Sequence, residues 1–107
     1  HHRVGPPWLA EALRAIDRAP ERHRPLAELA AQANVSPPHF AREFKRYTGM
    51  TVTAYVNAKR IIAAKMLLAD GRLSVAEVAE RCGFASVPHF HRTFKSLMRA
   101  TPGSCRR

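Results

Sequence analysis

The sequence is built around the string Pro38-His39-Phe40-Ala41-Arg42-Glu43-Phe44-Lys45. Nearly the same string returns fifty residues later as Pro88-His89-Phe90-His91-Arg92-Thr93-Phe94-Lys95, so both copies read P-H-F-x-R-x-F-K. Each copy follows an apolar segment with an x-A-E-x-A core, centred on Glu28 and on Glu77. These upstream segments match at an offset of 49 residues and the downstream strings at 50, which indicates one residue added in the second turn. A match of this length indicates an internal duplication.

Each copy has the pattern of a helix-turn-helix, in which a short helix, a tight turn and a longer helix follow one another. In the first copy the short helix is expected from about Pro25 to Ala33, because Asn34 tolerates the left-handed conformation that closes a helix. In the second copy it ends at Cys82-Gly83. The expected caps are Ser36 and Ser86 on the longer helices and Ser74 with Glu77, as a capping box, on the second short helix. The expected buried faces are Phe40, Phe44 and Tyr47 in one longer helix and Phe90, Phe94 and Leu97 in the other.

A long helix is expected between the two copies, capped by Thr51 and reaching about Leu68. Its apolar residues, which include Ile62 and Met66, lie on more than one face. A helix that is apolar on most sides is usually covered on most sides. We therefore expect a connector that is partly buried by each unit.

The ends of the chain complete an all-α prediction. Apolar residues at helical spacing predict an N-terminal helix from about Pro7 to Arg18, and Thr101-Pro102 opens a last short turn or helix. No segment shows the alternation of a strand. The predicted fold is two helix-turn-helix subdomains, about seven helices in all, joined by the connector. The expected parts are residues 1–50 with the first helix-turn-helix, the connector 51–69, and residues 70–107 with the second.

The charge of the chain points to a polyanionic partner. Eighteen Lys and Arg residues against eight acids give a formal net charge of +10 and an isoelectric point near 11.1. No acid occurs between Glu43 and Asp70, and none follows Glu80, so each repeat ends in a purely basic stretch. One-sided basic runs of this kind favour nucleic acid or an anionic membrane surface as the ligand.

Other function classes lack their motifs. Cys82 and Cys105, even with His89 and His91, match neither a disulfide framework nor a zinc spacing, so we expect no metal. There is no nucleophile–base pair and no glycine-rich phosphate loop, so we expect no enzyme and no cofactor. No apolar run reaches the ~18–20 residues that a membrane span needs. The opening His1-His2-Arg3 does not resemble a signal peptide, and the cytoplasm is the expected compartment.

The residues of the second half resemble a known family. The matching elements are Val75-Ala76-Glu77-Val78-Ala79, Cys82-Gly83-Phe84, Ser86, His89-Phe90, Arg92, Phe94-Lys95 and Thr101-Pro102, with Tyr55, Arg60-Ile61, Ala64 and Leu67-Leu68 in the connector. With them, the segment from about Leu26 to Pro102 resembles the DNA-binding region of AraC/XylS-type bacterial transcription regulators. The resemblance implies two recognition helices that enter successive major grooves of double-stranded DNA. It also implies that a small-molecule effector would act only through a domain absent from this chain.

The chain departs from the family pattern at three positions. Arg99 stands where the family commonly has glycine, Cys105 where an aromatic is common, and Val52 where proline is usual. We expect these changes to affect the packing of the last turn more than DNA binding.

The faces opposite the phenylalanines are the expected DNA-contacting faces. By the resemblance, the base-reading positions are Pro38, Ala41 and Arg42 in the first copy and Val87, His91 and Arg92 in the second. The expected phosphate contacts are Lys45, Arg46 and Lys95, together with the helix N-termini at Ser36 and Ser86. Six to ten neutralised phosphates would give log K a slope against log salt of roughly −5 to −9.

The two copies differ in reading power. Arginine grips guanine O6 and N7 with two hydrogen bonds, so Arg42 and Arg92 are the expected main readers. Pro38 and Ala41 offer no donor, whereas His91 donates or accepts, so we hypothesise that the second unit discriminates sequence more strongly. His39 and His89 are interpreted as structural, and Arg60 as a strut between the units in preference to a phosphate contact.

Two rivals stay open at this stage. A sequence-indifferent architectural DNA-binding protein would explain the charge but not two capped recognition helices. Against a basic protein of the membrane surface, the apolar faces are explained by internal packing. The prediction is a sequence-specific DNA-binding domain that recognises an asymmetric operator, because its two units differ. A surface for RNA polymerase could coexist with DNA binding, although no residue identifies one.

Overall fold

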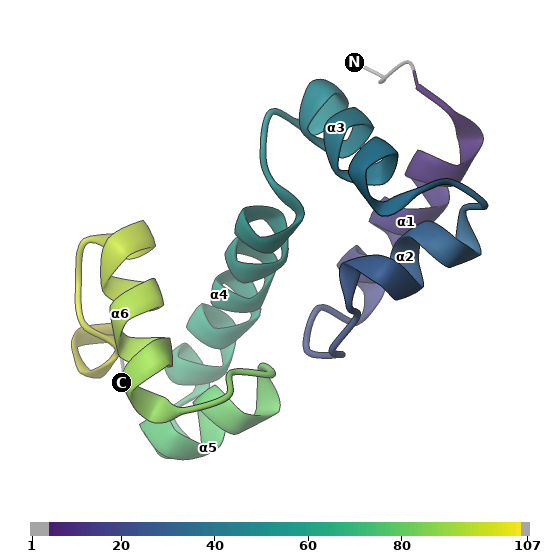
Figure 1. Ribbon diagram of the computed structural model, residues 1–107. Helices are drawn as coiled ribbons and strands as arrows, with labels where there is room; N and C mark the ends of the chain where they lie inside the picture. The colour runs from purple at the N-terminus through teal and green to yellow at the C-terminus, as the bar shows by residue number, and fades with distance from the viewer. Residues whose placement is uncertain (1–4, 106–107) are drawn as a thin grey trace. The chain divides into compact units, whose positions relative to one another are not determined.

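The computed structural model describes residues 5–105, and over that range it contains six α-helices, one short 3-10 helix and no strand (Figure 1). The elements are α1 (Pro7–Arg18), α2 (Leu26–Gln32), α3 (Pro37–Thr48), α4 (Val52–Asp70), α5 (Val75–Arg81), α6 (Val87–Met98) and the 3-10 helix η1 (Pro102–Cys105). The all-α prediction is therefore confirmed. The chain divides between Val56 and Asn57, inside α4, into two compact units, called unit 1 and unit 2 below. The predicted three-part division stays a prediction.

The core of unit 1 forms where α1, α2 and α3 meet (Figure 1). Its buried residues are Leu9, Leu13, Ile16, Leu29, Ala30, Phe40 and Phe44. The Trp8 ring lies 5.1 Å from that of Phe40, and the Tyr55 ring meets Phe44 edge-on at 5.4 Å. The Tyr55 hydroxyl also donates a 2.7 Å hydrogen bond to the Asp17 carboxylate. The first turn of α4 is thus fastened to unit 1 by packing and by a charge-assisted bond.

Arg24 closes the C-terminal end of α1. Its guanidinium donates to the carbonyl oxygens of Ala19 at 2.8 Å and Ala15 at 2.9 Å. Each of these carbonyls also accepts a backbone N–H at 3.2 Å, and the C-terminal end of a helix carries partial negative charge, so a cation there is stabilising. Arg24 therefore holds the α1–α2 connection against α1.

The two turns are equivalent in their backbone geometry. In unit 1, Asn34 has φ 58° and the Val35 N–H donates to the Ala30 carbonyl at 3.1 Å. In unit 2, Gly83 has φ 90° and the Phe84 N–H donates to the Ala79 carbonyl at 3.0 Å. Both are Schellman turns, in which one left-handed residue redirects the chain and satisfies the end of the short helix. The expected helix closures are confirmed.

The core of unit 2 is built by the C-terminal part of α4 with α5 and α6. Its buried residues are Ile61, Ala64, Leu68, Val78, Ala79, Cys82, Phe84, Phe90 and Phe94. Arg60 donates a 3.0 Å hydrogen bond to the Gly83 carbonyl and its guanidinium carbon lies 6.0 Å from the centre of the Phe84 ring. Arg60 and Gly83 both belong to unit 2, so these two contacts make Arg60 a strut within that unit, and its role as a strut between the units stays a prediction.

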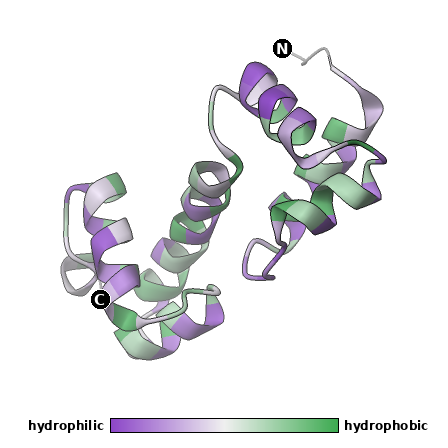
Figure 2. Ribbon diagram, viewed as in Figure 1, coloured by the Kyte–Doolittle hydropathy of each residue, from purple (hydrophilic) through white to green (hydrophobic). Residues whose placement is uncertain are grey.

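Three apolar side chains that were expected to be covered are exposed. Leu97 is 48% exposed, whereas Tyr47 at the matching position of unit 1 packs against its core. The Tyr47 ring is long enough to lie beside Gly5 and Leu9, and in unit 2 Met98 takes the packing role instead. On α4, Ile62 and Met66 are 56% and 71% exposed. Figure 2 shows apolar and polar positions mixed along α4, so its hydropathy does not identify the covered side.

Candidate nucleic-acid interface

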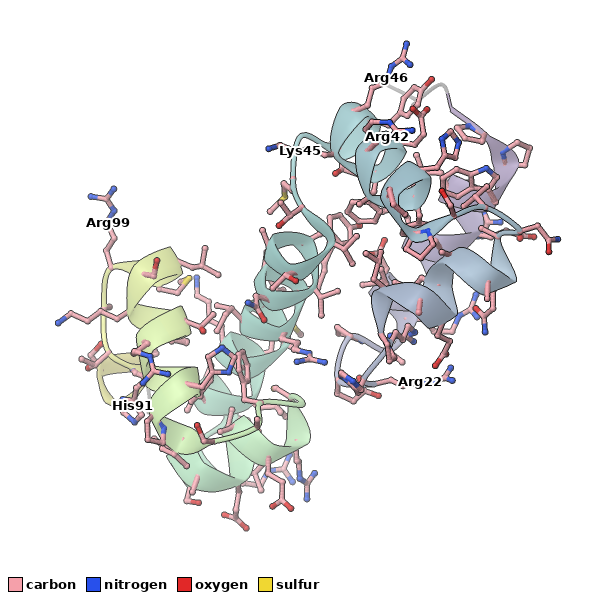
Figure 3. The ribbon with its side chains drawn as sticks, in the orientation of Figure 1. Arg22, Arg42, Lys45, Arg46, His91 and Arg99 are labelled. Carbon is pink, nitrogen blue, oxygen red and sulfur yellow. The ribbon has the colours of Figure 1, made fainter. Side chains whose placement is uncertain are left out.

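The outer side of α3 is set by its two buried phenylalanines. Phe40 and Phe44 are fully buried, and four residues apart they occupy one side of the helix. Pro38, Arg42, Lys45 and Arg46 are exposed, and Ala41 is half-buried. Figure 3 shows Arg42, Lys45 and Arg46 projecting from α3. The structure therefore brings the expected base and phosphate contacts of the first copy together on one helix, with Ala41 partly withdrawn.

Arg42 makes one weak contact, with the ring of His39. One of its guanidinium nitrogens lies 3.5 Å from His39 Nδ1, at the limit of a hydrogen bond, and the contact requires Nδ1 to be the acceptor. The His39 ring is half-buried, 6.2 Å from Trp8, and the matching His89 lies edge-on to Phe84 at 5.5 Å. Both histidines pack on aromatic rings, in agreement with a structural role. Arg42 keeps most of its donors free for a ligand.

Arg46 is partly engaged by its own helix. Its guanidinium lies 3.8 Å from the Glu43 carboxylate and 5.5 Å from the centre of the Tyr47 ring. An exposed ion pair of this kind contributes little to stability and exchanges readily. A phosphate could therefore take Arg46, but it would compete with Glu43 for it. Lys45 has no such acidic partner in the described residues.

An open groove of about 710 Å³ runs beside α3 within unit 1. Its lining residues are Arg24, Leu26, Pro38, Ala41, Arg42, Lys45, Arg46, Thr51, Val52 and Thr53. The lining thus combines apolar side chains, four cations and two threonines. Such a surface suits a sugar–phosphate strand, whose sugars are apolar on one side and whose phosphates are anionic. Sequence reasoning did not place Thr51 and Thr53 beside α3, because their closeness depends on how the start of α4 packs.

The outer side of α6 resembles that of α3, but its cations have no acidic neighbour on the helix. Phe90 and Phe94 are fully buried, and Val87, His91, Arg92 and Lys95 are exposed. Thr93 and Ser96 replace the Glu43 and Arg46 of the first copy, so no acid lies on this helix. Arg92 and Lys95 form no ion pair with any residue that the structure describes. The cations of α6 are therefore not neutralised by a neighbour.

The serines at the helix N-termini act as caps. Ser36 Oγ accepts from the His39 N–H at 3.3 Å and Ser86 Oγ accepts from the His89 N–H at 3.2 Å. Pro37 and Pro38 have no N–H, so the first turn of α3 has no spare backbone donor beyond that of Ser36 itself. At the start of α3, therefore, only the Ser36 N–H could donate to a phosphate. At α6 the Val87 N–H is still available, since only Pro88 lacks one.

No other chemistry competes for these faces in the part of the chain that the structure describes. No group of three or more His, Cys, Asp or Glu residues there could hold a metal ion. Among the same residues, no helix is both long enough and apolar enough to cross a membrane.

Comparisons with known proteins agree with the fold. A protein-family model described as "Helix-turn-helix domain" matches residues 29–107. The chain is 32% identical over 98 residues to the regulatory protein PocR of Salmonella typhimurium, a match that covers 92% of this chain and 32% of PocR. The chain spans about a third or less of the length of the curated relatives it matches.

Two solved structures are similar at 30% identity and a TM-score of 0.84. One is the DNA-binding domain of AdpA, a global transcriptional factor, in complex with a target DNA; the match covers 90% of this chain and 86% of that one. The other is a transcriptional regulator of the AraC-type DNA-binding domain-containing proteins from Chromobacterium violaceum, with 94% and 89% covered. The relatives are named as regulators, in line with the expectation of no catalytic activity. This chain belongs to the AraC-type helix-turn-helix domain family.

Proposed function

We propose that the chain is the sequence-specific DNA-binding domain of a bacterial AraC-type transcription regulator, with α3 and α6 as its recognition helices. The observation that carries the proposal is the matched pair of capped helices, each with a buried phenylalanine face and an exposed basic face. A single basic patch would serve an architectural protein equally well, but two such helices with one arginine at the same position provide readout. The DNA-bound AdpA domain supports the same use of the fold.

In this proposal the two helices read two blocks of one asymmetric site. Arg42 and Arg92 each take a guanine by its major-groove edge, and His91 and Val87 add a polar and an apolar contact in the second block. Pro38 and Ala41 provide shape and a contact to a thymine methyl. The blocks lie about one helical turn, roughly 34 Å, apart on straight DNA.

Phosphates are contacted by the residues around these readers. Lys45, Arg46 and Lys95 supply the charges, and Ser36 and Ser86 supply polar groups at the start of each recognition helix. The three-part organisation, with residues 1–50 and 70–107 on either side of the connector 51–69, is the functional division that we propose. A cytoplasmic location follows from a chromosomal ligand. An effector domain and a contact with RNA polymerase belong to the whole regulator.

The test is selection of bound duplexes from a random pool at about 0.15 M salt. We expect one asymmetric motif with two blocks about a turn apart. Enrichment of one block alone would mean that only one unit reads bases while the other grips phosphates. Tight, salt-sensitive binding without any enriched motif would instead establish the architectural function and refute the regulator.

A further inference from the structure

Arg99 occupies a backbone position that favours glycine. It ends α6 with φ 56° and ψ 30°, and its N–H donates to the Lys95 carbonyl at 2.8 Å. The matching residue of unit 1 is Gly49, which has φ 78° and makes the same 2.8 Å bond to Lys45. A residue with a Cβ is strained in this left-handed region, whereas glycine is not. Gly49 shows that the motif closes well without a side chain at this position.

The fold makes no use of the Arg99 side chain. The residue is exposed, and Figure 3 shows its side chain extending away from the ribbon at the end of α6. Its guanidinium makes no hydrogen bond, ion pair or ring contact with any residue between 5 and 105. No side-chain contact inside the protein therefore offsets the strain, and the guanidinium is available to a ligand outside it.

The two recognition helices carry different numbers of cations, and Arg99 makes up the difference. The α3 face has three cations, of which Arg46 is shared with Glu43. At the matching positions α6 has Ser96 and Thr93, which carry no charge. Arg99 restores the third cation of unit 2 one turn beyond Lys95, where no acid competes for it.

The spacing along α6 suits a DNA backbone. Arg99 lies eight residues beyond His91, which corresponds to a rise of about 12 Å. The major groove is roughly 12 Å wide and about 8.5 Å deep, so the distance from the base edges on its floor to either phosphate ridge is about 10 Å. With His91 at the bases, the end of α6 reaches the ridge that borders the groove.

We infer that Arg99 is a phosphate-binding residue of unit 2, a contact that is retained at the expense of the stability of the α6 terminus. The inference rests on the proposed DNA-binding function and adds one backbone contact to it. The chemistry is that of a guanidinium on a phosphodiester oxygen, independent of the base sequence. Arg99 should therefore affect affinity and salt dependence but not the selected motif.

The test compares Arg99→Gly, Arg99→Lys and the wild-type 107-residue chain on the duplex that the wild type selects. For Arg99→Gly we expect a higher unfolding midpoint together with weaker binding, about 5- to 10-fold at 0.1 M salt, and a log–log salt slope shallower by roughly 0.9. Arg99→Lys keeps the charge and the strain, so it should retain most of the slope without a gain in the midpoint.

Arg14→Gln is the matched control, because it removes one exposed positive charge from α1, which is not a recognition helix. An unchanged slope in Arg99→Gly, or an equal loss in Arg14→Gln, would overturn the inference while leaving the DNA-binding function intact. If the wild type enriches no motif and shows no salt-sensitive binding, the proposed function itself fails and the inference falls with it.

Discussion

Arg24 lies beside the proposed DNA-binding face, yet its contacts give it a structural role. It lines the groove next to α3, but its guanidinium donates at 2.8 and 2.9 Å to the carbonyls of Ala19, the C-cap of α1, and Ala15. Arg24→Met keeps most of the aliphatic stem and removes both donors and the charge. Hydrogen bonds that involve a charged group contribute about 1.5–3 kcal/mol each, and a cation at a helix C-terminus about 0.3–1 kcal/mol.

Because Arg24 is only half-buried and each carbonyl would keep a backbone N–H partner in the variant, we expect a loss below the sum of these terms, about 2 kcal/mol in all. That loss corresponds to a fall in Tm of roughly 8–16 °C for a domain of this size. The measurement is thermal and urea unfolding followed by far-ultraviolet circular dichroism. Arg22→Met is the control, since Arg22 makes an exposed ion pair with Glu28 that should contribute less than about 1 kcal/mol.

The same variants separate structural from DNA-facing cations. The Arg24 guanidinium is committed to carbonyl oxygens, so Arg24→Met should leave the salt slope of DNA binding nearly unchanged, whereas Lys45→Met should make it shallower by roughly 0.9. Equal stability losses in Arg24→Met and Arg22→Met would refute the capping argument. A slope change in Arg24→Met as large as that in Lys45→Met would show that Arg24 also contacts phosphate.

Three further predictions test readout, core and turn. Arg42→Ala should lower the discrimination between bases at one base pair by about 1–3 kcal/mol, and the double variant His91→Ala, Arg92→Ala should lose more discrimination. Competition with singly altered duplexes measures both losses. Equal losses would refute the hypothesis that unit 2 discriminates sequence more strongly. Phe94→Ala removes a fully buried ring and should cost about 3–5 kcal/mol in urea unfolding, with a cost under 1 kcal/mol contradicting its place in the core. Gly49→Ala should cost about 1–2 kcal/mol through its φ of 78° alone, because an added Cβ meets no atom within 4 Å; a neutral result would show that the turn relaxes.

The local elements of this protein could be predicted because their causes lie within a few residues. Ser74 and Glu77 form the expected capping box, with bonds of 3.1 and 2.8 Å between each side chain and the other's backbone N–H. The first short helix, expected from about Pro25 to Ala33, is observed as Leu26–Gln32. Such bonds join residues that are close in the chain, so their formation does not depend on the tertiary structure.

The outer faces of the recognition helices were also predictable. A phenylalanine pair four residues apart must point to the core, so Arg42 and Arg92 point away from it. The half-burial of Ala41 was not predictable in this way, because a small side chain at the edge of a face is covered or left open according to its neighbours. The groove beside α3 likewise depends on the start of α4.

The sequence by itself determined the duplication, the all-α class, the helix boundaries, the caps and the faces that carry positive charge. Only the tertiary structure decided that Arg24 closes α1, that Arg60 binds within unit 2, and that Leu97 and Met66 remain exposed. The physical reason is distance along the chain. Periodicity specifies which side of a helix is apolar, but the partner that covers it, or leaves it open, comes from residues remote in sequence.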